Sequence, residues 1–151
     1  NKEALLRNYH KIITDLDLFY LKNKVKKSII ITGTNGKSTT CSLVHHIFKK
    51  NKKQSTLAGN IGIPILSRKF SEKKIYVIEA SSFQLCYSKY IHPNLAVILN
   101  IKKDHLDWHY TQKKYIESKM RVFINQKKND YALLNNRRLK TLYIKKNLRE
   151  N

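Results

Sequence analysis

Apolar residues in this chain occur in short continuous runs, separated by longer segments in which they recur every three or four positions. The runs are rich in isoleucine, valine and leucine, which is typical of strands buried on both faces of a parallel sheet. They predict strands at 28–32, 75–78, 95–99 and 131–134, and a shorter strand at 55–58 that ends at the Gly59–Gly62 turn.

Between these runs lie segments with helical spacing. Residues 1–20, 37–50 and 111–125 place apolar side chains three and four positions apart, as one face of a helix requires. We expect the second helix to pack through Leu43, Val44, Ile47 and Phe48, and the third through Ile116, Met120 and Phe123. Strands that alternate with helices predict an α/β fold, in which helices flank a mostly parallel sheet.

Composition limits the class of protein. A length of 151 residues suits one domain with its own core. The net charge of +21 would suit a nucleic-acid partner, but the lysines are scattered along the chain, so we expect no specific nucleic-acid binding. No apolar run approaches the roughly 20 residues that span a bilayer, so we expect no membrane segment. Cys41 and Cys86 are isolated, which indicates buried, reduced thiols in a cytoplasmic protein.

The segment Ile29–Thr40 reads as a strand that ends in a glycine loop and continues directly into a helix. Glycines let backbone N–H groups face an anion, and the helix start adds partial positive charge. Lys37 supplies a full charge, and the Ser38 hydroxyl can hold Mg²⁺. The loop is shorter than the common phosphate loop, so an ordinary strand-to-helix turn is the alternative. We interpret it as a nucleotide-phosphate site made of Gly33, Thr34, Asn35, Gly36, Lys37, Ser38 and Thr39.

Two further polar clusters follow strands and should share the same edge of the sheet, because ligands gather at the carboxyl ends of parallel strands. Glu79 follows four apolar residues, which suits an oxygen ligand for a magnesium–nucleotide, the alternative being a surface carboxylate. His105 follows the 95–99 strand and is interpreted as a metal or substrate contact. Its spacing from His109 could also suit zinc, but no further Cys or His completes a tetrahedral set.

Lys119 lies beside the apolar face of the 111–125 helix. Periodicity alone favours a lysine whose stem covers the core while its amino group reaches water.

Together these motifs resemble those of the Mur ligases and the related folylpolyglutamate synthases. The matching segments are Thr32–Thr39, Gly59–Gly62, Glu79–Leu85, Asn100–Asp107 and Tyr115–Lys119, in family order and spacing. The Glu79–Leu85 segment favours the family member that adds D-glutamate to UDP-N-acetylmuramoyl-L-alanine. The alternatives are a folylpolyglutamate synthase or another Mur ligase, and a non-catalytic basic remnant or binding module.

The resemblance implies an ATP-dependent ligase of peptidoglycan precursor synthesis, working through an acyl phosphate. It assigns catalytic roles to Lys37, Glu79, His105 and Lys119, and substrate contacts to Asn60, Ser81, Gln84 and His105. One Mg²⁺ would be held by Ser38 and Glu79, and a second by His105 and Lys119. Family members carry a carbamylated lysine at the position of Lys119, because an ammonium, with a reference pKa of about 10.4, would repel Mg²⁺.

The resemblance also predicts a domain plan. Residues 1–14 are expected to be a remnant of the N-terminal UDP-binding domain, 15–135 a truncated central ATP-binding domain and 136–151 a basic tail, with the C-terminal ligase domain absent. We expect a monomer in the bacterial cytoplasm, with little or no ligase turnover by this fragment alone. Tyr110 stands where the family usually has a small residue, often glycine, and this difference is expected to alter the loop after His109.

Overall fold

A single parallel sheet organises the chain. The structure is a computed structural model that describes residues 2–67 and 69–135, so the basic segment expected at 136–151 lies outside the described residues. Within that part of the chain the sheet has the strand order β2-β3-β1-β4-β5, and every pairing is parallel. The strands are β1 (Ser28–Thr32), β2 (Ser55–Gly59), β3 (Ile75–Glu79), β4 (Leu95–Ile98) and β5 (Tyr131–Leu134). The predicted α/β class and strand positions are confirmed.

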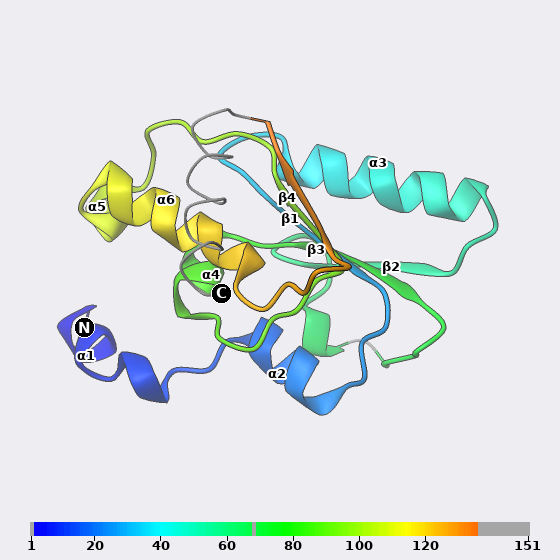
Figure 1. The fold of residues 1–151 in the computed structure, drawn as a ribbon, viewed down its shortest axis with the longest axis horizontal. Coiled ribbons are helices and arrows are strands. Elements are labelled where there is room, and N and C mark those ends of the chain that lie inside the picture. Colours follow the sequence, from blue (N-terminus) through cyan, green and yellow to red (C-terminus); the bar gives the residue numbers. More distant parts are fainter. Residues whose placement is uncertain (1, 68, 136–151) are drawn as a thin grey trace.

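Helices cover both faces of the sheet. Figure 1 shows α3 along one face, whereas α2, α4 and α6 lie on the other. The α-helices are α1 (Lys2–Arg7), α2 (Asp15–Lys22), α3 (Lys37–Lys50), α4 (Ser82–Tyr87), α5 (Leu106–His109) and α6 (Gln112–Met120). Single 3₁₀ turns form η1 (Tyr9–Lys11), η2 (Ile65–Ser67) and η3 (Arg121–Phe123).

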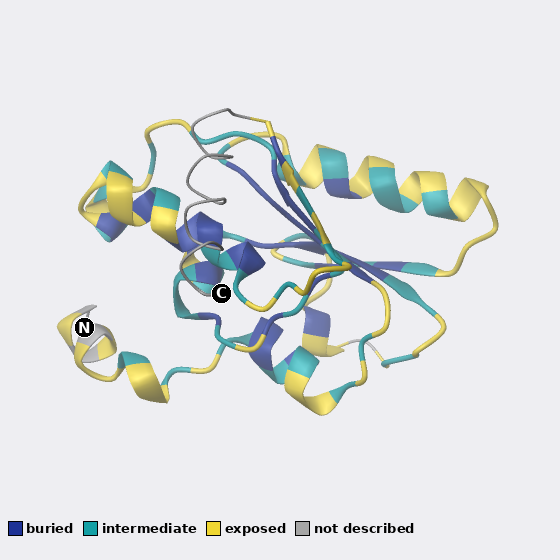
Figure 2. Ribbon diagram, viewed as in Figure 1, coloured by how far each residue is buried: buried dark blue, intermediate teal, exposed yellow. Residues whose placement is uncertain are grey.

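The core consists of two apolar layers, one on each face of the sheet. Successive residues of a strand point to opposite faces, so Ile30 belongs to the larger layer and Ile31 to the smaller one beneath α3. In the larger layer the ring of Phe19 packs edge-on against Tyr76, with ring centroids 4.9 Å apart. Figure 2 shows the buried residues concentrated in the strands and on the helix faces that meet them.

The packing face of α3 differs from the predicted stripe. Cys41, Val44 and Phe48 contact the smaller layer, whereas Leu43 and Ile47 are 57% and 50% exposed. Each residue turns a helix by about 100°, so positions one step from the contact line leave the interface. In the described part of the chain, the sheet therefore covers only part of the apolar face that was predicted for α3.

Both cysteines are free thiols. Cys41 is buried, and this burial, with Glu79 nearby, raises the pKa of its thiol to about 12. Cys86 is only half-buried, contrary to the prediction, and burial raises its pKa to about 11. Both thiols therefore remain protonated at neutral pH.

The N-terminal segment is not one helix. Residues 12–14 are extended, because Thr14 caps the start of α2 and accepts the backbone N–H of Asp17 at 3.1 Å. The third predicted helix is also shorter than expected, since α6 ends at Met120 and continues only as η3. Helices α4 and α5 were not predicted, because they are too short to show a helical period.

Asp17 and Lys89 join the N-terminal segment to the sheet. The buried Asp17 carboxylate accepts the backbone N–H groups of Lys89 at 2.8 Å and Tyr90 at 2.7 Å. In return, the Lys89 ammonium donates to three main-chain carbonyls, of Tyr9, His10 and Ile12. The segment on either side of Thr14 is therefore fastened to the loop that precedes β4.

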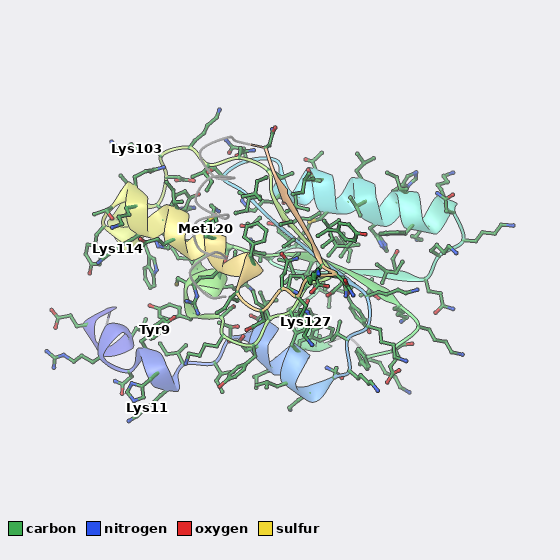
Figure 3. The ribbon with its side chains drawn as sticks, viewed as in Figure 1. Tyr9, Lys11, Lys103, Lys114, Met120 and Lys127 are labelled. Atoms are coloured by element: carbon green, nitrogen blue, oxygen red, sulfur yellow. The ribbon has the colours of Figure 1, made fainter. Side chains whose placement is uncertain are left out.

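The surface carries its positive charge on many separate elements. The four lysines labelled in Figure 3 come from four segments: Lys11 from η1, Lys103 from the loop before α5, Lys114 from α6 and Lys127 from the loop before β5. This agrees with the scattered lysines of the sequence. Among the helices that the structure describes, none has the length and apolar character needed to cross a membrane.

We predict that Asp17→Ala lowers the free energy of unfolding by about 2–4 kcal/mol, because it removes a buried carboxylate and leaves two partly buried N–H groups without that acceptor. Urea denaturation measures the loss. The control is Glu72→Ala, which removes an exposed carboxylate that pairs with Lys26 at the surface and should change stability much less. Equal losses in the two variants would contradict the role given to Asp17.

Candidate functional site

The strand order brings the predicted clusters together. Because β1 lies between β3 and β4, the loop that follows β1 emerges between Glu79, the last residue of β3, and Asn100, just beyond β4. The main chain closes this edge, since Ala80 N–H donates to Ile31 and Leu99 N–H to Thr32, both at 3.0 Å. Three segments distant in sequence therefore meet at one edge, as expected.

Gly36 shapes the start of α3. It is the N-cap residue and has a φ of 81°, a conformation that glycine adopts without strain. Lys37, the next residue, folds its side chain back over the loop, and its ammonium donates to the carbonyls of Gly33 at 3.1 Å and Thr34 at 3.0 Å. A charged group and the first turn of a helix thus face the same small space, as anion binding requires.

Two loop amides have protein partners. The N–H of Thr34 donates to the main-chain oxygen of Asn100 at 3.0 Å, and that of Asn35 to its side-chain oxygen at 2.9 Å. Phosphate contacts by Thr34 and Asn35 therefore stay a prediction. The first turn of α3, which includes the exposed Ser38 and Thr39, keeps amides without intrahelical acceptors.

Glu79 is buried, with 2% of its surface exposed. Its Oε1 accepts a hydrogen bond from the side-chain amide of Asn60 at 3.2 Å, whereas Oε2 is buried without a protein hydrogen-bond partner. The two residues also meet through the main chain, since Asn60 N–H donates to the Glu79 carbonyl at 2.9 Å. A buried carboxylate oxygen without a donor suits a cation, so Glu79 is not the surface carboxylate of the alternative interpretation.

Gly59 makes this close approach possible. A Cβ atom at this position would lie 2.2 Å from the Glu79 carbonyl oxygen, and the residue has a φ of 101°. Only glycine fits both conditions.

Lys119 is also buried, with 2% of its surface exposed, so the expectation from periodicity that its amino group reaches water is wrong. Its ammonium donates to the Gly33 carbonyl at 2.9 Å, the same oxygen that Lys37 contacts, and lies 4.8 Å from the centroid of the Tyr115 ring. Burial, together with the neighbouring Lys37 charge, lowers the pKa of Lys119 to about 8.

His105 stands at the open side of this edge. It precedes α5 with a φ of 50°, and its half-exposed ring lies 4.9 Å from that of Phe83, with Nε2 3.4 Å from Asp104. His109 faces another way: it is buried, and its Nε2 is 3.0 Å from the Ser82 hydroxyl. Among the residues that the structure describes, no three His, Cys, Asp or Glu side chains gather to hold a metal ion.

Ser81 and Gln84 build the start of α4. They form a reciprocal cap, in which the Ser81 hydroxyl accepts the Gln84 N–H and the Gln84 side-chain oxygen accepts the Ser81 N–H. The Gln84 amide nitrogen donates to both oxygens of Asp15, which ties α4 to α2. These contacts are structural, and the role of both residues in substrate binding stays a prediction.

Tyr110, which stands where a small residue was expected, has an unusual backbone conformation. Its φ of 64° and ψ of −42°, with a 2.8 Å hydrogen bond from Thr111 N–H to the His109 carbonyl, define a classic γ-turn. This turn is strained for a residue with a Cβ atom. The Lys114 ammonium lies 5.5 Å from the centroid of the Tyr110 ring and packs over it.

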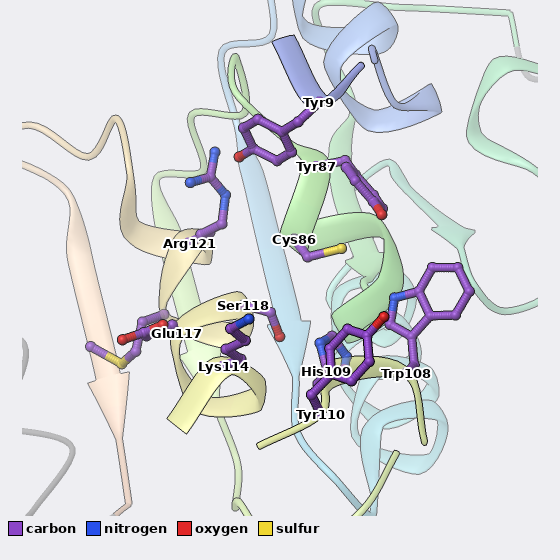
Figure 4. Close-up of a pocket in the computed structure, with 11 residues that line it drawn as sticks. Tyr9, Cys86, Tyr87, Trp108, His109, Tyr110, Lys114, Glu117, Ser118 and Arg121 are labelled. Atoms are coloured by element: carbon purple, nitrogen blue, oxygen red, sulfur yellow. The ribbon is translucent and has the colours of Figure 1, made fainter. Parts of the chain in front are cut away.

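A separate cavity of about 430 Å³ lies between η1, α4, α5 and α6. Figure 4 shows its aromatic walls, formed by Tyr9, Tyr87, Trp108 and Tyr110. None of residues 33–39 lines it, so it is distinct from the phosphate loop.

Comparison with known proteins agrees with these observations. The profile of the Mur ligase middle domain matches residues 31–151. The UDP-N-acetylmuramoylalanine--D-glutamate ligase of Rickettsia prowazekii is 48% identical over 124 residues, which is 82% of this chain and 28% of that protein. The ligase of the same name from Caldicellulosiruptor bescii is 43% identical over 127 residues, or 83% of this chain and 28% of that protein.

Solved structures share the fold. MurF from Acinetobacter baumannii superposes with a TM-score of 0.67 at 16% identity, over 86% of this chain and 32% of that one. A UDP-N-acetylmuramate:L-alanyl-gamma-D-glutamyl-meso-diaminopimelate ligase from Neisseria meningitides gives 0.62 at 15% identity, over 87% and 46%. The chain spans less than a third of the length of the two ligases named above from sequence comparison.

We predict that Tyr110→Gly is more stable than Tyr110→Ala by about 1 kcal/mol. Both variants lose the aromatic ring, so their difference isolates the cost of a Cβ atom in the γ-turn. Thermal and urea unfolding of the pair measure it. Equal stability, or a more stable alanine variant, would show that the turn relaxes when the ring is removed.

Proposed function

The chain belongs to the Mur ligase family, and we propose that it supplies the ATP-binding edge of an enzyme that joins D-glutamate to UDP-N-acetylmuramoyl-L-alanine. The relatives at 43–48% identity carry that activity in their names, and this favours it over a folylpolyglutamate synthase. Since the chain spans less than a third of their length, the activity is proposed for the complete enzyme.

One observation carries the proposal: the Glu79 oxygen that is buried without a hydrogen-bond partner, at the same edge as the ammonium groups of Lys37 and Lys119. A non-catalytic remnant has no need to keep such a carboxylate, because its burial costs free energy unless a cation or donor compensates it. A magnesium–nucleotide provides the cation for Glu79 and the phosphate charge for Lys37.

Lys37 and the first turn of α3 bind the nucleotide phosphates in this proposal. The ammonium of Lys37 donates to two loop carbonyls, and it would exchange these hydrogen bonds for contacts with a phosphate oxygen. The helix amides add neutral donors whose direction is fixed by the fold, which stabilises the charge that develops during phosphoryl transfer.

Two magnesium sites are proposed. Ser38 and Glu79 would hold the first ion, and His105 with a carbamylated Lys119 the second. Bound Mg²⁺ neutralises phosphate charge and polarises the transferred phosphoryl group. The unpartnered Glu79 oxygen fits such an ion, whereas the free ammonium of Lys119 fits only after carbamylation.

The reaction that this edge would support has two steps. The alanine carboxylate of the muramoyl substrate attacks the γ-phosphorus of ATP, which forms an acyl phosphate and releases ADP. The amine of D-glutamate then attacks the acyl carbon, and the tetrahedral intermediate loses phosphate and a proton to give the amide. Lys37 acts here by reducing repulsion between the carboxylate and the γ-phosphate.

Asn60, Ser81, Gln84 and His105 are proposed to contact the muramoyl substrate. Asn60 and His105 are exposed, the latter beside α4, and Ser81 and Gln84 lie at the start of that helix. We further propose that the enzyme works as a monomer in the bacterial cytoplasm, where UDP-linked precursors and ATP are both available.

We predict that the chain binds Mg-ATP and that Lys37→Ala weakens binding by about tenfold or more, because a charge at the phosphates is lost. Isothermal titration calorimetry measures the affinity. Lys50→Ala is the matched control, since it removes the same charge from the far end of α3 and should leave binding almost unchanged. Equal affinity of the folded wild type and Lys37→Ala would exclude the proposed phosphate site.

We predict that Lys119 forms a carbamate with dissolved CO₂. Carbamates form from the neutral amine, and a pKa of about 8 makes half of Lys119 neutral at pH 8, against roughly one part in 300 for an ordinary lysine. The carbamate should therefore decline as the pH falls below 8. Carbon-13 NMR with labelled bicarbonate should show a protein-bound carbamate signal that Lys119→Arg lacks. The same signal in both proteins would place the carbamate elsewhere.

A further inference from the structure

Asn100 makes a paired contact with the phosphate loop that none of the assigned site residues explains. Its side-chain oxygen accepts the Asn35 N–H at 2.9 Å, and its side-chain nitrogen donates to the Asn35 carbonyl at 2.9 Å. Its main-chain oxygen accepts the Thr34 N–H at 3.0 Å. Asn100 alone thus binds both Thr34 and Asn35, the two residues that lie between the glycines of the loop.

The close approach of the loop to the end of β4 makes this contact possible. A Cβ atom at Gly33 would lie 3.1 Å from the Cβ of Leu99 and 3.4 Å from the backbone nitrogen of Asn100, so little space separates the two segments. A second restraint acts at Thr34, whose hydroxyl accepts the Lys102 N–H at 3.0 Å and lies 3.0 Å from the Tyr115 hydroxyl. The loop is therefore held by side chains on the side away from α3.

We propose that Asn100 is a positioning residue for nucleotide binding, which fixes the short loop so that phosphate is met by Lys37 and the first turn of α3. This inference rests on the nucleotide-phosphate function proposed above. Because the amides of Thr34 and Asn35 already donate to Asn100, the loop is held in one conformation before phosphate binds. The neutral side-chain amide of Asn100 also satisfies both main-chain polar groups of Asn35, the N–H and the C=O, without placing a negative charge beside the phosphates.

Asn94, at the other end of β4, provides a matched control. Its side-chain oxygen accepts the Ser28 N–H at 2.9 Å and its own N–H donates to the Ser28 carbonyl at 3.1 Å, so it also binds one residue of the β1 segment. It differs from Asn100 in lying at the amino end of the strands, away from the phosphate loop. A purely structural role predicts similar consequences for the two asparagines.

The first experiment measures amide hydrogen exchange by NMR in Asn100→Ala and Asn94→Ala. Asn100→Ala should accelerate exchange of the Asn35 amide by about tenfold or more, because its acceptor is gone. The Thr34 amide, which donates to the main-chain oxygen, should keep its rate and serves as an internal reference. Asn94→Ala should leave Asn35 unchanged. An unchanged Asn35 rate in Asn100→Ala would overturn the proposal.

The second experiment measures Mg-ATP affinity of the same variants by calorimetry. Asn100→Ala should weaken binding by about tenfold, and Asn94→Ala by much less, even if both lose similar stability. Equal affinities in the two variants would overturn the positioning role. Asn100→Leu, which has the size of asparagine without its polar atoms, replaces the alanine variant if that one does not fold.

The two proposals can fail separately. If the folded wild type does not bind Mg-ATP, the nucleotide function proposed for this chain fails. The exchange rate of the Asn35 amide in Asn100→Ala still tests whether Asn100 holds the loop.

Discussion

Two ammonium groups donate to one carbonyl oxygen at the centre of this site, and the other site residues lie around that contact. Lys37 reaches the Gly33 carbonyl from the start of α3, and Lys119 reaches it from α6 on the opposite face of the sheet. The two positive charges oppose each other, and the buried Glu79 ends β3, the strand next to β1. Such an edge is better matched to an anion with its own metal ion than to water.

The position of this contact depends on strand order more than on any single motif. With β1 between β3 and β4, the loop, the carboxylate and Asn100 emerge side by side although they are far apart in sequence. The same order explains why the N-terminal segment matters. Asp17 binds the turn that leads into β4, so the strand that carries Asn100 is anchored at its amino end as well.

Much of this arrangement could be predicted from the sequence. Apolar runs located the five strands, and the loop after β1 was singled out by the type and order of its residues. The burial of Lys119 could not be predicted. Helical periodicity tells which face of α6 a residue lies on, but not how far a long side chain reaches into the protein. The contact of Asn100 was equally hidden, since it joins residues 65 positions apart and no local pattern records such a pairing.

The contact between Gly59 and the Glu79 carbonyl has a genetic consequence. Every single-base change that replaces a glycine codon by another amino acid introduces a side chain with a Cβ atom. At position 59 that atom would lie 2.2 Å from the carbonyl oxygen of the acid that the site depends on. Every one-step replacement here is therefore strained, whereas no such clash restricts the exposed Leu43 and Ile47 of α3. Because the contact is with a main-chain carbonyl, residue 59 should stay glycine whatever side chain stands at position 79.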